Sequence, residues 1–336
     1  MKSKVSIEKV ARLSWIVNFV ILVCLSPSYL LAAEPAAPQQ PQKVTVKAAS
    51  PAAGAPRTFD TPQQAADVLV KAAEDFDTTA LIHIFGTRGS DVVFSGEFAQ
   101  DKQRAADFTA QAREKKSVSV DPKNGNRAFL LVGKEDWPFP VPIVKRGAKW
   151  SFDAVAGREE LLNRRIGANE LDAIQVCHGY VEAQIAYALQ PREGYTVNQY
   201  AQRVISTQGK QDGLAWQNSD GSWAGPIGEK IARAIEQGYN PREEPYHGYY
   251  FKILKGQGPA APMGQMDFVV KGVMIGGYAL IASPAIYGVT GIKSFLVSHD
   301  GVVYEKDLGV NSVEEFKKME RFNPDNSWTP VPDEDQ

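Results

Sequence analysis

The stretch ANELDAIQVCHGYVEAQIAYAL, residues 168–189, decides how the second half of the chain should fold. Apolar side chains recur every three or four positions after Leu171, which predicts a helix packed on one side. Gly167 predicts a break from a shorter helix over Arg158–Arg165, and Pro191 should end the pattern. The predicted buried stripe is Leu171, Ile174, Cys177, Val181, Ile185 and Ala188, and the opposite stripe is Asp172, Gln175, Gly179 and Glu182.

The glycine-rich remainder predicts an antiparallel β-meander that folds over this helix. Asp300-Gly301 is typical of a hairpin turn. Short helices are expected over Val197–Ser206 and Gly225–Gln237, and a last helix over Val313–Met319. The predicted strands are Tyr249–Leu254, Phe268–Val270, Gly277–Ala282, Ser294–Ser298 and Val302–Lys306.

Residues 58–155 predict a separate lobe of helices followed by a small antiparallel sheet. Asp60 or Thr61 can cap a first helix, and Pro62 fits its first turn. Further helices are expected over Thr78–Phe85 and Gly96–Glu114. The predicted strands are Ser117–Asp121, Ala128–Val132, Val141–Lys145 and Lys149–Asp153.

Alternating prolines mark the stretch WPFPVP, residues 137–142. Proline donates no hydrogen bond to a neighbouring strand, so this stretch should be an edge strand or an extended arm. Two interpretations stay open: a plain packed edge, or an aromatic surface that binds a partner. The candidate partner surface consists of Trp137, Phe139, Trp216, Trp223 and Tyr249, for which core packing is the alternative.

The N-terminus has the pattern of a secretory signal peptide. Basic residues precede the apolar run Leu13–Leu25, and small residues follow, so residues 1–33 are expected to be removed after Ala33. An uncleaved anchor is the alternative. Residues 34–57 are rich in Pro and Ala and predict a disordered linker, and residues 329–336 predict an acidic tail. The protein is therefore expected to be exported, periplasmic or extracellular, with no transmembrane span after cleavage.

The composition limits the possible classes of function. The 336 residues are 43% hydrophobic and 23% charged, which excludes a wholly disordered protein. A formal net charge of −2 argues against a nucleic-acid partner. Only Cys177 would survive cleavage, so no intrachain disulfide is expected. Cys177 is interpreted as a buried hydrophobe or, alternatively, as a reactive thiol.

No arrangement of residues predicts a reaction, a cofactor or a metal site. The four histidines lack the paired spacing of a zinc helix, and no Gly-x-Ser-x-Gly motif occurs. His178 and Glu182 stand one turn apart on the predicted helix and, with His247, form a candidate polar cluster. Such a pair is either a surface contact or an imidazole oriented by a carboxylate. Glu170 could join neighbouring arginines in a charge network, or belong to a solvated face.

Four stretches resemble an exported bacterial family, domain-of-unknown-function family 2950. They are residues 135–142, 164–171, 246–251 and 302–309, and the resemblance extends from about Thr58 to Trp328. It implies no activity. A second, partial resemblance is to pseudopilin-like proteins of type II secretion, through Asn169, Glu170, Ala173, Gln184 and Tyr187, the stretch 248–251, Ala282-Ser283-Pro284 and the run from Phe295 to Asp300-Gly301.

These observations predict an α+β protein with two lobes, over residues 58–155 and 156–328. The first combines helices with a small antiparallel sheet, and the second is a long helix packed on an antiparallel meander, pilin-like in outline. The expected function is that of a non-catalytic envelope protein that binds or helps assemble a surface or secretion partner. A cell-envelope hydrolase using a histidine and a carboxylate is the alternative.

Overall fold

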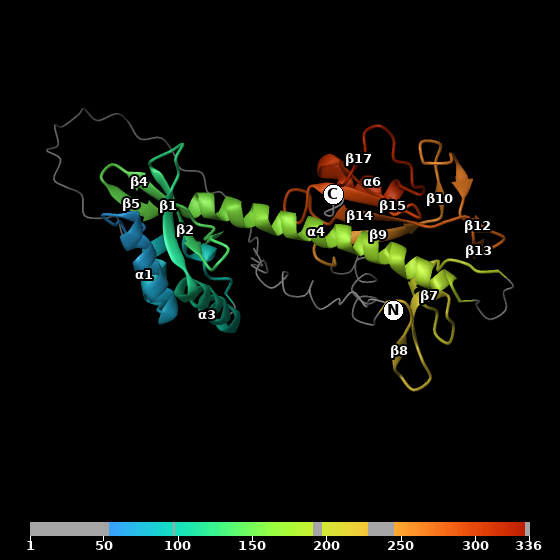
Figure 1. The fold of residues 1–336 in the computed structure, drawn as a ribbon, viewed down its shortest axis with the longest axis horizontal. Coiled ribbons are helices and arrows are strands. Elements are labelled where there is room, and N and C mark those ends of the chain that lie inside the picture. The colour runs from blue at the N-terminus through green and yellow to red at the C-terminus, as the bar shows by residue number, and fades with distance from the viewer. Residues whose placement is uncertain (1–53, 97, 191–196, 228–244, 333–336) are drawn as a thin grey trace, which may run out of the picture. The chain divides into compact units, whose positions relative to one another are not determined.

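A computed structural model describes residues 54–96, 98–190, 197–227 and 245–332 (Figure 1). The described residues form two compact units that divide between Asn163 and Arg164, rather than at residue 155. Residues 54–163 are called the N-unit here, and residues 164–332 the C-unit. Both combine helices with antiparallel sheets, so the protein is α+β. The predicted signal peptide lies outside the described residues, as does most of the predicted linker.

Three α-helices form one side of the N-unit. The Thr61 hydroxyl accepts a hydrogen bond from the Gln64 N–H at 3.1 Å and caps the first helix, as predicted. The Asp77 carboxylate caps the second in the same way, at 2.9 Å from the Ala80 nitrogen. The helices are α1 (Pro62–Glu74), α2 (Thr78–Phe85) and α3 (Phe98–Glu114), with a short 3-10 turn, η3 (Ser90–Val92).

The N-unit sheet is antiparallel and packs its buried side chains against these helices. The strand order is β1-β2-β4-β5, and β3 pairs with the same edge of β2 as β4 does. Leu69, Ile84 and Phe152 belong to the core between helices and sheet. The strands are β1 (Lys116–Val120), β2 (Arg127–Val132), β3 (Trp137–Pro138), β4 (Ile143–Arg146) and β5 (Lys149–Phe152), close to the predicted ranges.

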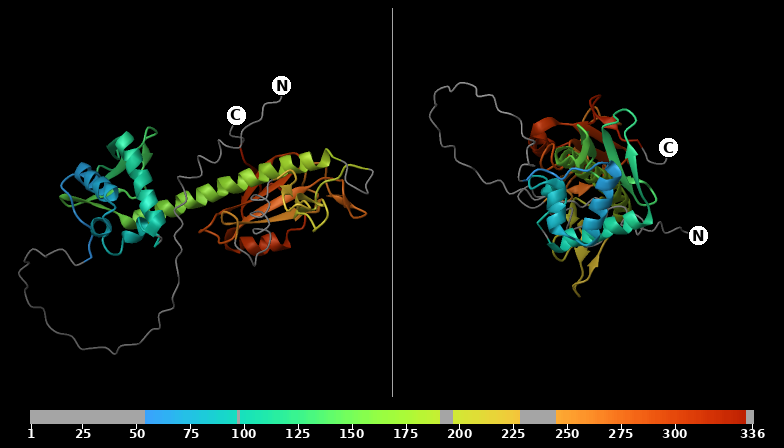
Figure 2. Two further views of the ribbon diagram at one scale, coloured as in Figure 1. Left: turned by 90° about the horizontal axis from the view of Figure 1, so that it is seen from below. Right: turned by 90° about the vertical axis from the view of Figure 1, so that its left-hand side faces the viewer.

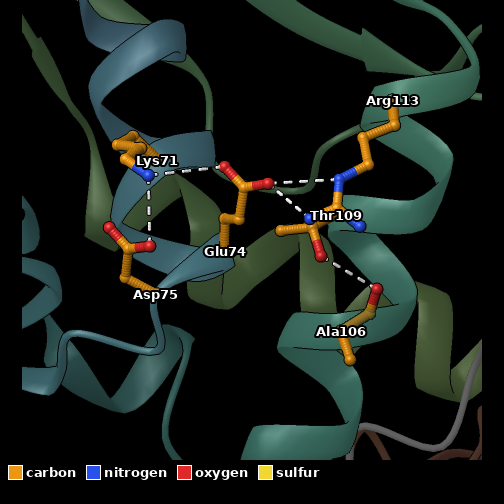
Figure 3. Close-up of polar contacts among 6 residues, drawn as sticks. All are labelled: Lys71, Glu74, Asp75, Ala106, Thr109 and Arg113. Atoms are coloured by element: carbon orange, nitrogen blue, oxygen red, sulfur yellow. Dashed lines mark hydrogen bonds and ion pairs between the residues drawn. The ribbon is translucent and has the colours of Figure 1, made fainter.

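Ion pairs on the surface of the N-unit join α1 to α3 (Figure 3). The Arg113 guanidinium donates to the Glu74 carboxylate, with 3.2 Å between Nε and Oε1. Lys71 lies one turn away and pairs with Asp75 at 3.1 Å. Hydrogen bonding to Arg113 lowers the pKa of Glu74 below its ordinary value. All four side chains are exposed to water, so these pairs position the helices more than they stabilise them.

The long helix α4 (Ala154–Ala188) is continuous through Gly167, so the predicted break there is wrong. A glycine inside a helix costs only about 1 kcal/mol relative to alanine, which is too little to end a helix without a proline or a cap. The side chains that face the core also differ from the prediction. Cys177 and Val181 are buried as predicted, but Leu171 and Ile185 are 52% and 51% exposed. The buried face also carries Ala173, Tyr180, Gln184 and Tyr187, which were not predicted to lie there.

The buried face of α4 covers one side of the main sheet of the C-unit, and the short helix α6 (Ser312–Lys318) covers the other (Figure 2). All pairs in this sheet are antiparallel, in the order β17-β16-β15-β14-β9. Tyr180, Phe251, Leu280 and Phe295 belong to the core of this unit. The strands are β9 (Tyr249–Leu254), β14 (Ala279–Pro284), β15 (Lys293–Ser298), β16 (Val303–Asp307) and β17 (Thr329–Pro330).

Three segments of the C-unit differ from their predictions. Residues 197–206 form no helix but contain β6 (Arg203–Ile205), which pairs in parallel with β7 (Gly213–Gln217). The predicted acidic tail begins with β17, which pairs with β16, and only residues 333–336 lie outside the described residues. The predicted helix over Gly225–Gln237 falls mostly outside them.

Smaller elements complete the C-unit. The strand β8 (Trp223–Ala224) pairs with β7, and Gly309–Asn311 forms the 3-10 turn η4 before α6. Two further pairs join β10 (Gly256–Gln257) to β11 (Met266–Asp267), and β12 (Val269–Val270) to β13 (Val273–Met274). Across the described ranges, no helix combines the length and apolarity needed to span a membrane.

Candidate functional site

Two of the family-like stretches meet in the C-unit at the loop that precedes β15. Glu170 and Asn169, on α4, both bind the backbone of this loop. The Glu170 carboxylate accepts hydrogen bonds from the Ile292 and Lys293 N–H groups at 2.8 and 2.9 Å. The Asn169 amide donates to the Thr290 carbonyl at 2.8 Å. Glu170 therefore binds backbone donors 122 and 123 residues further along the chain.

The second stretch forms a tight turn beside Asn169. His247 and Gly248 have φ of +46° and +75°, and Tyr246 and Tyr249 exchange backbone hydrogen bonds of 3.1 and 2.9 Å. This is the geometry of a type I′ hairpin turn. A Cβ added at Gly248 would lie 2.7 Å from the Thr290 Cβ, so only glycine fits there. The turn is thereby locked against the same loop that Glu170 binds.

Tyr249 also binds the backbone at the start of β15. Its side chain is fully buried, and its hydroxyl donates to the Lys293 carbonyl at 2.8 Å. Burial and the nearby Glu170 carboxylate raise the pKa of Tyr249 above its ordinary value. Tyr249 therefore belongs to the core, and its assignment to a partner surface is wrong.

His247 is paired with a carboxylate on α4 that was not part of the candidate polar cluster. Its Nδ1 atom bonds the Asp172 carboxylate, and the two side chains are 38% and 27% exposed. The Tyr246 ring contacts the imidazole at a tilt of 44°, with 4.2 Å between ring centroids. A carboxylate at Nδ1 favours the tautomer with hydrogen on Nδ1, in which Nε2 is a hydrogen-bond acceptor. His178 and Glu182 are both exposed on α4.

Cys177 lies in the core of the C-unit, as one of its two interpretations predicted. The side chain is fully buried, and burial raises the pKa of the thiol to about 12. The thiolate is the nucleophilic form, and at neutral pH it is scarcely populated at this pKa. The reactive-thiol interpretation is therefore wrong for the folded chain.

The WPFPVP stretch of the N-unit separates into one exposed and one packed aromatic residue. Trp137, the first residue of β3, is 44% exposed. Phe139 is half-buried and packs against Phe108 and Phe152, with ring centroids 5.3 and 6.2 Å apart. Phe139 therefore anchors this edge to the core, and Trp137 lies on the surface.

Trp216 and Trp223 lie on the paired strands β7 and β8 of the C-unit. Trp216 is opposite Ala224, and Trp223 is opposite Gln217. Successive side chains on a strand point to opposite faces, so the two tryptophans lie on opposite faces of this hairpin. Both are half-buried. They do not form a single aromatic shelf.

Gln184 is a structural residue that sequence reasoning did not assign. It is fully buried on α4, where its amide exchanges hydrogen bonds of 2.8 Å with both the N–H and the carbonyl of Ala201. Its Nε2 also donates to the Tyr180 hydroxyl at 3.0 Å. The side chain thus pairs with the segment before β6 as a neighbouring strand would. Only the true orientation of α4 would have indicated this role.

Comparison with known proteins finds one match. The model of a family described as "Protein of unknown function (DUF2950)" matches residues 56–331, which cover nearly all the described parts of both units. No curated protein and no solved structure matches the chain. In the described ranges, no group of three or more His, Cys, Asp and Glu side chains is placed to hold a metal ion.

Proposed function

The chain belongs to the DUF2950 family, and we propose that it is a non-catalytic protein that binds, or helps assemble, a partner in the cell envelope. One observation carries this proposal. The polar side chains Asn169, Glu170 and Tyr249, all in family-like stretches, bind the chain's own backbone. Their hydrogen-bonding capacity is used to hold α4, the 246–249 turn and the loop before β15 together.

The chemistry of these contacts supports a structural role. A carboxylate that accepts two backbone N–H bonds is oriented and partly neutralised by them, so it is poorly placed to act as a general base. The buried thiol of Cys177 cannot supply a ready nucleophile either. A framework of this kind is suited to presenting side chains to another protein.

Trp137 is the best candidate for such a contact. Tryptophan is enriched among residues that dominate binding energies, and Trp137 is exposed at the edge of a sheet. Phe139 anchors the same stretch to the core, so the edge should lose little conformational freedom on binding. The expected signal peptide and linker support a proposed location of this surface in the periplasm or outside the cell. The partial pseudopilin resemblance favours a secretion or pilus protein as the partner.

Crosslinking and pull-down from intact envelopes tests the proposal. We expect the chain to capture one major protein partner, and Trp137→Ala to reduce the yield at least about tenfold. Phe98→Ala is the matched control, because Phe98 is an aromatic residue of the same unit that is 67% exposed. Equal capture by Trp137→Ala and the parent chain would contradict the assignment of the surface. No reproducible partner would contradict the function.

A cell-envelope hydrolase is the second candidate, and the pairing of His247 with Asp172 is the observation that favours it. Its test is the release of soluble fragments from purified cell wall. Activity that survives replacement of both His178 and His247 by alanine would remove this candidate. Activity lost in His247→Ala alone would instead support it.

A further inference from the structure

In the C-unit, five exposed positions on the outward face of α4, together with Leu189 directly after the helix ends, have a regular spacing. They are Leu171, Gln175, His178, Glu182, Ile185 and Leu189, separated alternately by four and three residues. This is the spacing of the contact positions in a coiled coil. Leu171, Ile185 and Leu189 are 52%, 51% and 74% exposed. The sheet packs against the other side of the helix (Figure 2), so this face has the pattern of a helix contact and no sheet beneath it.

The six positions are symmetric about residue 180. If two copies of α4 cross antiparallel at that residue, Leu171 of one copy faces Leu189 of the other. Gln175 then faces Ile185, and His178 faces Glu182. Each of these pairs occurs twice, as a two-fold axis requires. The arrangement places leucines together at both ends and an imidazole against a carboxylate on both sides of the axis.

We propose that this face binds the same face of a second copy of the chain, with the two α4 helices antiparallel. Charge complementarity selects both the occupant and the direction. A parallel pair would place Glu182 against Glu182, and like charges in register are unfavourable. The antiparallel pair instead gives each carboxylate a hydrogen-bond donor.

The expected complex is weak. From Leu171 to its end at Ala188, α4 spans about 26 Å at 1.5 Å per residue, and a contact of this length buries less surface than a typical stable dimer. We therefore expect association in the micromolar range or weaker, which reversible methods detect. This inference uses a surface of the C-unit and is independent of the proposed partner contact at Trp137.

Sedimentation equilibrium of the protein, in the form its host cell produces, tests the proposal from about 1 to about 300 µM. We expect reversible conversion from monomer to dimer. The double variant Leu171→Glu, Leu189→Glu should weaken association at least about tenfold, since it places carboxylates at both ends of the contact between the two helices. Val310→Glu is the matched control, because Val310 is 80% exposed on η4, outside this face, and it should associate like the parent.

A charge exchange tests the direction. His178→Glu alone should weaken the dimer, because it places two carboxylates opposite each other on both sides of the axis. Adding Glu182→His should restore association, since the pair is then recreated with its members exchanged. A parent chain that stays monomeric throughout would overturn the proposal. So would association unchanged in the leucine double variant, or a charge-exchanged variant no stronger than the single one.

Discussion

Replacing Gln184 should be the most informative test of how the C-unit is held together. Its fully buried amide makes three hydrogen bonds, two of them with the backbone of Ala201, which is itself fully buried. Gln184→Ala removes all three and leaves a buried N–H and carbonyl without their partner. Each orphaned group costs about 1–3 kcal/mol, and the lost side-chain volume adds to this. We expect a loss of about 4 kcal/mol from an unfolding free energy of about 5–15 kcal/mol.

Gln184→Glu separates the shape of the side chain from its hydrogen-bonding capacity. The new carboxyl can still accept from the Ala201 N–H, but its second oxygen faces the Ala201 carbonyl and must carry a proton. Burial therefore raises the pKa of this carboxyl in the folded state above the unfolded value of about 4.3. Relative to the parent at each pH, stability is retained below that value and is lost as the pH rises above it.

Urea unfolding at about pH 4 and pH 7 measures both effects, with native-state hydrogen exchange to localise them in the C-unit. Gln175→Ala is the matched control, because it removes an exposed glutamine from the same helix and should change stability by less than about 0.5 kcal/mol. A loss below about 1 kcal/mol in Gln184→Ala would refute the reasoning. So would a Gln184→Glu variant whose deficit is equal at the two pH values.

Three further outcomes are expected. Glu170→Ala should lower the unfolding free energy by about 3 kcal/mol through two lost charge-assisted bonds, and Glu170→Gln by about 1 kcal/mol, as measured in urea. Cys177 should resist a thiol reagent at pH 8 in the native chain and react in 6 M urea, as followed by absorbance. Gly291→Ala should destabilise by about 2 kcal/mol, since its Cβ would lie 2.1 Å from the Tyr249 hydroxyl, whereas Gly167→Ala should stabilise by up to about 1 kcal/mol.

Local patterns predicted most of the secondary structure. Thr78–Phe85 and Tyr249–Leu254 have the predicted bounds, because a cap, a glycine stop or a run of aromatic and β-branched residues marks each end. A helix was wrongly predicted over 197–206 because Val197, Ala201 and Val204 recur at helical spacing. Its actual contacts include the parallel pairing with β7 and hydrogen bonds with the Gln184 side chain, and both are set by distant residues.

The orientation of α4 could not be predicted from its most apolar residues. Leu171 and Ile185 suggested the buried face, yet Tyr180, Gln184 and Tyr187 occupy it. Tyrosine and glutamine can be buried where their polar atoms find partners, which these do, so polarity alone did not indicate their position.

The candidate site was harder to predict than the fold. Glu170 and the loop it binds are more than a hundred residues apart, and no local spacing connects them. His247 was identified, but its partner Asp172 had been assigned only to the exposed face of a helix. Phe139 and Tyr249 were named as candidates for a partner surface, with core packing as the alternative, and the packing seen in the structure assigns Phe139 to an anchor and Tyr249 to the interior.

Strand β14 has a consequence for the lifetime of the C-unit. All six of its residues are buried, with β9 and β15 as its neighbours on either edge. Its amide protons can exchange with solvent only when the elements around the strand unfold. Their exchange should therefore be the slowest in the unit and should report its global unfolding. Proteases should gain access to this strand through the same rare event. Where proteolysis is faster than reclosing, the opening rate of this strand would limit how long each molecule survives.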